Sequence, residues 1–128
     1  MINAIAKGQR YQVSKHFYSN EFDCNCNSNL CNWTLFSYEI IGLLEKIRAS
    51  CGNKPLYINS AYRCLPFNST IGGKPKSKHL LGLAVDMSPP GTVPLEEFFF
   101  RVSEIGFDVV IRYDEKDFIH CHLNPRMH

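Results

Sequence analysis

Two histidine-containing segments carry the side chains with the most specific chemistry. The stretch SKHLLGLAVD places His79 seven residues ahead of Asp86, and FIHCHL near the other end contains His120 and His122. Imidazole nitrogens and carboxylate oxygens bind zinc, and two histidines with one carboxylate form a usual catalytic set that leaves a position for water. The sequence therefore raises the question of whether the fold brings His79, Asp86 and His120 together.

The alternation of side chains along a strand allows this convergence. GLAVDM has the pattern of a strand in which Gly82, Ala84 and Asp86 share one face, and His120 and His122 share one face of FIHCHL. If the two strands are neighbours, Asp86 and His120 converge, and the preceding loop carries the first histidine to them. A single histidine or aspartate more often satisfies local backbone groups, so the pattern needs support from its context.

Two helices are predicted to support these strands. In LFSYEIIGLLEKIRAS the apolar residues recur at helical spacing and CGN follows, which predicts a helix over residues 36 to 50. PPGTV breaks the chain before a second helix from about Pro94 to Ile105, and proline suits a first helical turn. The first 34 residues are weakly periodic and then irregular, and no regular element is expected there.

Several short strands complete the expected fold. LYINSAY has the alternating pattern of a strand, and the CLPFNSTIGGKPKSKH that follows is typical of a turn-rich loop or a short helical turn. FDVVIRY and FIHCHL, separated by the polar DEKD, predict a β-hairpin. These elements predict an α+β fold with a small, mostly antiparallel sheet and helices packed on one side. At 128 residues we expect a single domain, residues 1 to 128.

Charge and hydropathy restrict the partners. Fourteen Lys and Arg against twelve Asp and Glu give a net charge of +2, which is too small to indicate nucleic acid. Lys7, Gln9 and Arg10 interrupt the start of the chain, and no apolar run approaches membrane-spanning length. We therefore expect a chain made in the cytoplasm without an export signal and without membrane insertion.

The cysteines leave three interpretations open. They are six in number: Cys24, Cys26, Cys31, Cys51, Cys64 and Cys121. The first three, in DCNCNSNLC, can contribute to a thiolate metal site, although they lack the C-x2-C pair of common zinc knuckles. Disulfides would suit an oxidising compartment, and reduced thiols would suit the cytosol.

Two motifs resemble one enzyme family. The pattern S-x-H-x-x-G-x-A-x-D is met by Ser77, His79, Gly82, Ala84 and Asp86. An upstream S-x-Y-R with a following Asn and Gly-Gly is met by Ser60, Tyr62, Arg63, Asn68, Gly72 and Gly73. Over residues 17 to 124 the chain resembles the zinc D-alanyl-D-alanine peptidases, which include D,D-carboxypeptidases, vancomycin-resistance dipeptidases and phage endolysin peptidases. The Hedgehog signalling domain has a similar fold.

The resemblance implies a role for most of these residues. It implies one zinc ion held by His79, Asp86 and His120, and it places Arg63 at the substrate, where a guanidinium can bind a carboxylate or stabilise an oxyanion. Ser60 and Ser77 are candidate substrate-binding residues, and the alternative is that each hydroxyl bonds its own backbone.

The general base has three candidates. Asp117 stands three residues before His120, as in many relatives, and Asp114 stands six before it, as in Hedgehog-type domains. His122, on the face of His120, is the third. Strand parity favours Asp114 if the hairpin is regular, whereas Asp117 requires a bend just before Phe118. We expect Asp117 to act as the base because it matches the peptidase spacing.

The resemblance thus implies a zinc-dependent peptidase that cleaves stem or cross-link peptides of peptidoglycan, as a D,D-carboxypeptidase or an endopeptidase. We expect a monomeric phage-type lysis enzyme that acts at the cell wall or periplasm after release. The alternatives are a non-catalytic zinc-containing binding module of the same fold and a structural metal domain built on the cysteines. Five aromatic residues are expected to pack the core rather than bind the wall: Phe17, Tyr18, Phe22, Trp33 and Phe36.

Overall fold

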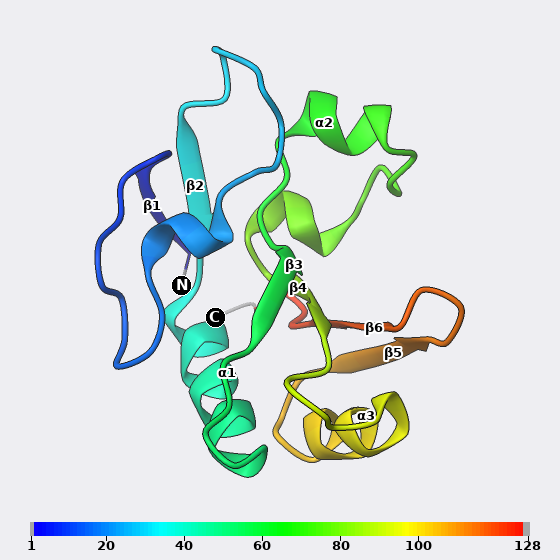
Figure 1. Cartoon of the computed structure of the whole chain (residues 1–128). Coiled ribbons are helices and arrows are strands. Elements are labelled where there is room, and N and C mark those ends of the chain that lie inside the picture. The colour runs from blue at the N-terminus through cyan, green and yellow to red at the C-terminus, as the bar shows by residue number, and fades with distance from the viewer. Residues whose placement is uncertain (1, 127–128) are drawn as a thin grey trace.

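The computed structural model describes residues 2 to 126 and contains two antiparallel sheets (Figure 1). The larger sheet has the strand order β3 (Tyr57–Ser60), β4 (Ala84–Ser88), β6 (Phe118–His122) and β5 (Val109–Tyr113). All neighbours are antiparallel, as predicted. The strands that carry the candidate ligands are adjacent, and Asp86 lies directly opposite His120.

The helices confirm the expected α+β architecture. The α-helices are α1 (Tyr38–Ser50), α2 (Leu65–Thr70) and α3 (Leu95–Ser103), and the short 3-10 helices are η1 (Ser19–Phe22) and η2 (Lys78–Leu81). Helix α1 begins two residues later than predicted because the Ser37 hydroxyl caps it by accepting from the Glu39 N–H. Among the described residues, no helix is long and apolar enough to span a membrane.

The core lies between one face of the large sheet and two helices. Val85 and Met87 on β4 and Ile119 and Cys121 on β6 are at most 1% exposed. The same apolar cluster takes in four side chains from α1 and two from α3: Ile40, Ile41, Leu44, Ile47, Phe98 and Val102. The opposite face of β4 and β6 carries Asp86, His120 and His122, so one β-sheet separates the core from the candidate site.

A second, two-stranded sheet was missed by the sequence analysis. β1 (Asn3–Ala6) pairs with β2 (Trp33–Phe36), in segments expected to have no regular element. Each strand has four residues, which is too short for a readable alternation. The packing role expected for Trp33 was also wrong, because its side chain is 60% exposed on β2. Phe17, Phe22 and Phe36 are buried as predicted, and Tyr18 is half-buried.

A glycine brings the small sheet against the loop that carries the first histidine. Gly82 ends η2 with φ 72°, a conformation that favours glycine. A Cβ atom at this position would lie 2.6 Å from the backbone carbonyl of Leu35. The absent side chain therefore lets η2 contact β2 directly. Figure 1 shows α2 at the end of the molecule opposite α1 and α3, with the turn of η2 between α2 and the strands.

Candidate metal centre

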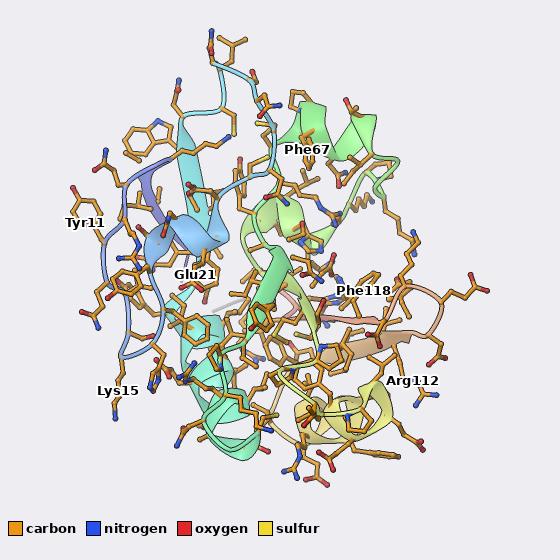
Figure 2. The ribbon with its side chains drawn as sticks, in the orientation of Figure 1. Tyr11, Lys15, Glu21, Phe67, Arg112 and Phe118 are labelled. Carbon is orange, nitrogen blue, oxygen red and sulfur yellow. The ribbon has the colours of Figure 1, made fainter. Side chains whose placement is uncertain are left out.

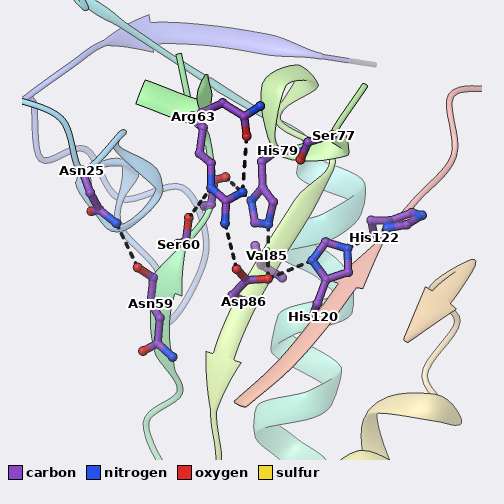
Figure 3. A network of polar contacts seen from close by, with 12 residues as sticks. Asn25, Asn59, Ser60, Arg63, Ser77, His79, Val85, Asp86, His120 and His122 are labelled. Atoms are coloured by element: carbon purple, nitrogen blue, oxygen red, sulfur yellow. Dashed lines mark hydrogen bonds and ion pairs between the residues drawn. The ribbon is translucent and has the colours of Figure 1, made fainter. Parts of the chain in front are cut away.

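His79, Asp86 and His120 converge on one point, as the sequence predicted (Figure 3). Oδ1 of Asp86 lies 3.2 Å from Nε2 of His79 and 2.9 Å from Nδ1 of His120. One ligand atom from each residue lies within 4.8 Å of the others. Strand pairing places Asp86 and His120 side by side, and the η2 turn carries His79 to them.

The spacing and orientation of the three donors fit one zinc ion. Zinc bonds of about 2.0 to 2.1 Å place the ligand atoms of a tetrahedral site about 3.3 Å apart. His79 is 2% exposed, and its Nδ1 lies 2.6 Å from the carbonyl oxygen of Ala61. Donation from Nδ1–H to that carbonyl leaves the Nε2 lone pair facing Asp86, which is the arrangement that orients a zinc-binding histidine.

Asp86 is held in its ionised form. Burial alone would raise its pKa, but the facing ring nitrogens of His120 and His79 donate to the carboxylate when they are protonated, and these hydrogen bonds and charges lower the pKa of Asp86 to about 2. A carboxylate that stays deprotonated at neutral pH is the form that binds a metal ion. The centre is therefore prepared electrostatically for a divalent cation.

Arg63 fixes the second oxygen of Asp86. Its Nη2 donates to Oδ2 at 3.1 Å, its Nε donates to the Ser60 hydroxyl at 3.1 Å, and its Nη1 donates to Oδ1 of Asn68 at 3.4 Å (Figure 3). Asn68 is 1% exposed and also donates to the carbonyl of Lys74. The motif that contains Asn68 gives no sign of this supporting role in the sequence.

The close packing around Asn68 explains one of the paired glycines. A Cβ atom at Gly73 would lie 2.1 Å from Oδ1 of Asn68, the oxygen that accepts from Arg63. The Gly73 N–H also donates to the Asn68 backbone carbonyl at 2.8 Å. Only glycine therefore leaves Asn68 in position to hold the guanidinium.

The two candidate substrate-binding serines have structural contacts. The Ser77 hydroxyl caps η2 by accepting from the backbone N–H of His79 at 3.2 Å, which is the local alternative considered from the sequence. Ser77 also lines the cavity in front of the ligands, whereas Ser60 is outside that lining and contacts Arg63. A substrate contact for either serine stays a prediction.

The ligands face a cavity of about 570 Å³. The segment that leads into η2 lines it with three lysines, Lys74, Lys76 and Lys78, and the β5–β6 hairpin adds a fourth lysine together with Ile111, Tyr113 and Phe118. The rings of Tyr113 and Phe118 stack with centroids 4.6 Å apart. These lysines were not predicted to line the site, although the alternation KPKSKH was the available signal.

His122 contacts the third ligand from the side away from Asp86. Its Nδ1 lies 2.8 Å from Nε2 of His120, and it lines the cavity. Burial, followed by the nearby charges of His120 and Lys78, lowers the pKa of His122. A neutral His122 can accept the Nε2–H of His120, which leaves Nδ1 of His120 free to face Asp86.

The two acidic base candidates lie in the turn between β5 and β6. Asp114 is 67% exposed and its Oδ1 pairs with Nε of Arg112 at 2.7 Å, beside the hairpin residues labelled in Figure 2. Asp117 is exposed with φ 53°, so the chain does bend just before Phe118. Neither aspartate is among the residues that line the cavity. Their role as base stays a prediction.

Comparison with known proteins matches the part of the chain that contains this centre. The family model described as Peptidase M15 matches residues 15 to 122, which include all three candidate ligands. A curated relative, the zinc D-Ala-D-Ala carboxypeptidase of Streptomyces albus G, is 36% identical over 44 residues. That match covers 34% of this chain and 17% of the relative's length.

Proposed function

The chain belongs to the peptidase M15 family, and on that premise we propose that it is a zinc-dependent peptidase that cleaves peptidoglycan peptides. The observation that carries the proposal is the convergence of His79, Asp86 and His120 at the wall of an open cavity. Zinc, when bound there, supplies a Lewis acid that lowers the pKa of water and polarises a peptide carbonyl.

The residues around the cavity suit an anionic peptide end. Lys74, Lys76 and Lys78 place positive charge along one wall, which attracts the carboxylate of a peptide that ends in D-alanine. Arg63 also lines the cavity, and its guanidinium can stabilise an oxyanion while it holds Asp86. We therefore assign substrate orientation to the lysines and a combined role to Arg63.

We assign the proton-accepting role to Asp117. It stands three residues before His120 in the spacing found in related peptidases, and its left-handed backbone turns the chain into β6. Asp114 is engaged by Arg112, which makes it the weaker candidate. Catalytic hydrogen bonds often become short only when substrate binds. The exposure of Asp117 in the absence of substrate is therefore compatible with its role as the base.

The proposal includes a biological setting and a reaction class. We propose that the enzyme acts as a monomer on stem or cross-link peptides of the cell wall, in the manner of the phage lysis peptidases that the sequence resembles. The relative named zinc D-Ala-D-Ala carboxypeptidase supports a carboxypeptidase reaction. An endopeptidase of the same mechanism differs only in the substrate group that occupies the cavity beyond the scissile bond.

A non-catalytic zinc-containing binding module of the same fold is the second candidate. One observation favours it, namely that neither Asp114 nor Asp117 lines the cavity that contains the metal ligands. A binding module would keep zinc and the peptide-binding wall but would not cleave. The two candidates therefore predict the same metal content and different reaction products.

Digestion of purified peptidoglycan followed by mass analysis of the fragments separates these outcomes. Loss of one alanine from stem peptides indicates a carboxypeptidase, and conversion of cross-linked dimers to monomers indicates an endopeptidase. Chelation should stop either reaction and added zinc should restore it, whereas His79→Ala should stay inactive after zinc is added. Intact fragments from a fully zinc-loaded wild-type protein would instead establish the binding module.

A further inference from the structure

Four cysteines gather where the connection between η1 and β2 meets the start of α2. Cys24, Cys26 and Cys31 lie on that connection, and Cys64 is the residue that caps α2. Their four Sγ atoms all lie within 4.8 Å of one another. Cys24 is 3% exposed and the other three are half-buried, so the group is largely shielded from solvent.

The spacing of the sulfur atoms matches a tetrahedral four-thiolate site. Zinc–sulfur bonds of about 2.3 Å place the sulfur atoms of such a site about 3.8 Å apart. Sγ of Cys64 lies 3.7 Å from Sγ of Cys24 and 3.9 Å from Sγ of Cys26. In a disulfide, two of the sulfur atoms would be bonded at about 2.0 Å. Two nearly equal distances from one sulfur atom therefore favour a shared central ion.

We propose that Cys24, Cys26, Cys31 and Cys64 bind a second zinc ion that is independent of the peptidase centre. Four protein ligands complete the tetrahedral shell and leave no position for water, which is typical of a structural zinc site. Tetrahedral sulfur sites also accept iron. We assign zinc because four cysteines around one ion are a standard ligand set of structural zinc sites.

Polar groups next to the sulfur atoms support their ionised form. The Cys64 backbone N–H donates to Sγ of Cys24 at 3.4 Å. The Lys7 ammonium donates to Sγ of Cys26 at 3.3 Å and to the Cys26 carbonyl at 3.1 Å. Four thiolates around one divalent ion keep a net negative charge, and a neighbouring cation with N–H donors stabilises that charge.

The connection that carries three of the ligands has almost no apolar anchor. In DCNCNSNLCN, residues 23 to 32, Leu30 is the single apolar residue apart from the cysteines, and its side chain is 91% exposed. Hydrophobic burial therefore does not explain why this segment lies against α2. Metal binding supplies the missing free energy, as it does in other small domains whose folding depends on zinc.

The zinc content of the purified full-length chain tests this proposal. Protein prepared under reducing conditions should contain two zinc ions per chain, and Cys31→Ser and Cys64→Ser should each contain one. The matched control is Cys51→Ser, which changes a buried cysteine outside the group and should keep both ions. His79→Ala should retain the thiolate ion, so failure of the peptidase proposal can be distinguished from failure of this one.

A spectrum of the wild-type chain decides the matter even if the serine variants do not fold. Replacement of zinc by Co²⁺ should give intense thiolate-to-cobalt charge-transfer bands, and His79→Ala should leave these bands unchanged. The proposal is overturned by a wild-type chain whose only zinc is lost in His79→Ala, by iron at the thiolates in place of zinc, or by a Cys31→Ser chain that keeps all of its zinc. Cobalt protein without thiolate bands, or thiols found paired in disulfides, would overturn it equally.

Discussion

Arg63 and Asp86 form an ion pair in which Nη2 of the guanidinium donates to Oδ2 of the carboxylate at 3.1 Å. The contact occupies one carboxylate oxygen and leaves Oδ1 to face both histidine ligands. The two side chains are only 14% and 10% exposed, so solvent screens the pair weakly. Arg63 therefore orients a metal ligand and lines the substrate cavity at the same time.

Arg63→Lys should weaken zinc binding about 10- to 100-fold, the range found when a partner of a metal ligand is lost. A lysine ammonium cannot contact Asp86, Ser60 and Asn68 together, so the carboxylate loses its fixed orientation. Competition with a zinc chelator measures the affinity. Arg101→Lys, which alters a guanidinium on α3 that contacts Ser50, is the control. Unchanged affinity with lost activity would mean that Arg63 acts on substrate alone.

Asp117→Asn should retain zinc and slow peptide hydrolysis by about 100- to 10,000-fold, the usual effect of losing a general base. Asp114→Asn should have a much smaller effect, because Asp114 is exposed and paired with Arg112. Hydrolysis rates and zinc content of both variants, measured side by side, check this assignment. If Asp114→Asn is inactive with zinc bound while Asp117→Asn stays active, Asp114 is the general base and this assignment is wrong.

His122→Ala should reduce activity less than loss of the base does, by about 10- to 100-fold. The reason is that His122 contacts His120 at 2.8 Å and so supports the ligand rather than the reacting atoms. His122→Asn supplies a side-chain oxygen that can accept the same proton and should recover part of the loss. Activity and zinc affinity should change together in both variants. A loss of activity in His122→Asn at full zinc affinity would point to direct contact with substrate.

Glu45→Gln should destabilise the protein by about 1 kcal/mol or more at neutral pH. Burial opposes ionisation of Glu45, but hydrogen bonds from the Ser14 hydroxyl and the ring and backbone of His16 lower its pKa overall. Because the pKa of Glu45 is lower in the folded protein than in the unfolded chain, its ionised carboxylate stabilises the fold. This contribution is complete above the pKa of the unfolded chain and is lost as the pH falls through the pKa of the folded protein.

Denaturant titrations of wild type and Glu45→Gln at a series of pH values measure this effect. The difference in free energy of unfolding should be constant at neutral pH and should shrink below about pH 4.5, where the unfolded carboxylate begins to protonate. Glu104→Gln, at an exposed position after α3, controls for the general effect of removing one charge. A difference that grows as the pH falls would contradict the assignment.

The centre of the site could be predicted because it depends on strand period and strand pairing. Asp86 and His120 face the same way on adjacent strands, and that placement follows from the alternation of side chains once the two strands are paired. The base candidates depend instead on the geometry of a turn. Whether Asp117 approaches the cavity is decided by its left-handed backbone conformation, which no periodic pattern encodes.

The features that were missed depend on contacts between distant segments. Cys64 completes the thiol group although it lies far along the chain from Cys24, Cys26 and Cys31, and motif spacing detects only neighbouring residues. Strands β1 and β2 are similarly stabilised by each other rather than by their own four-residue patterns. Asn68 acquires its role only where the fold places Arg63 against it.

The contact between Gly82 and Leu35 makes the N-terminal sheet part of the support of the metal centre. The η2 turn that carries His79 rests on the backbone of β2, and β2 is paired along its length with β1. The region matched by the family begins at residue 15, beyond β1. A chain that begins at that boundary would lack β1. Strand β2, which contacts the turn that carries His79, would then have no partner strand. Minimal versions for fusion or engineering should therefore retain Asn3–Ala6.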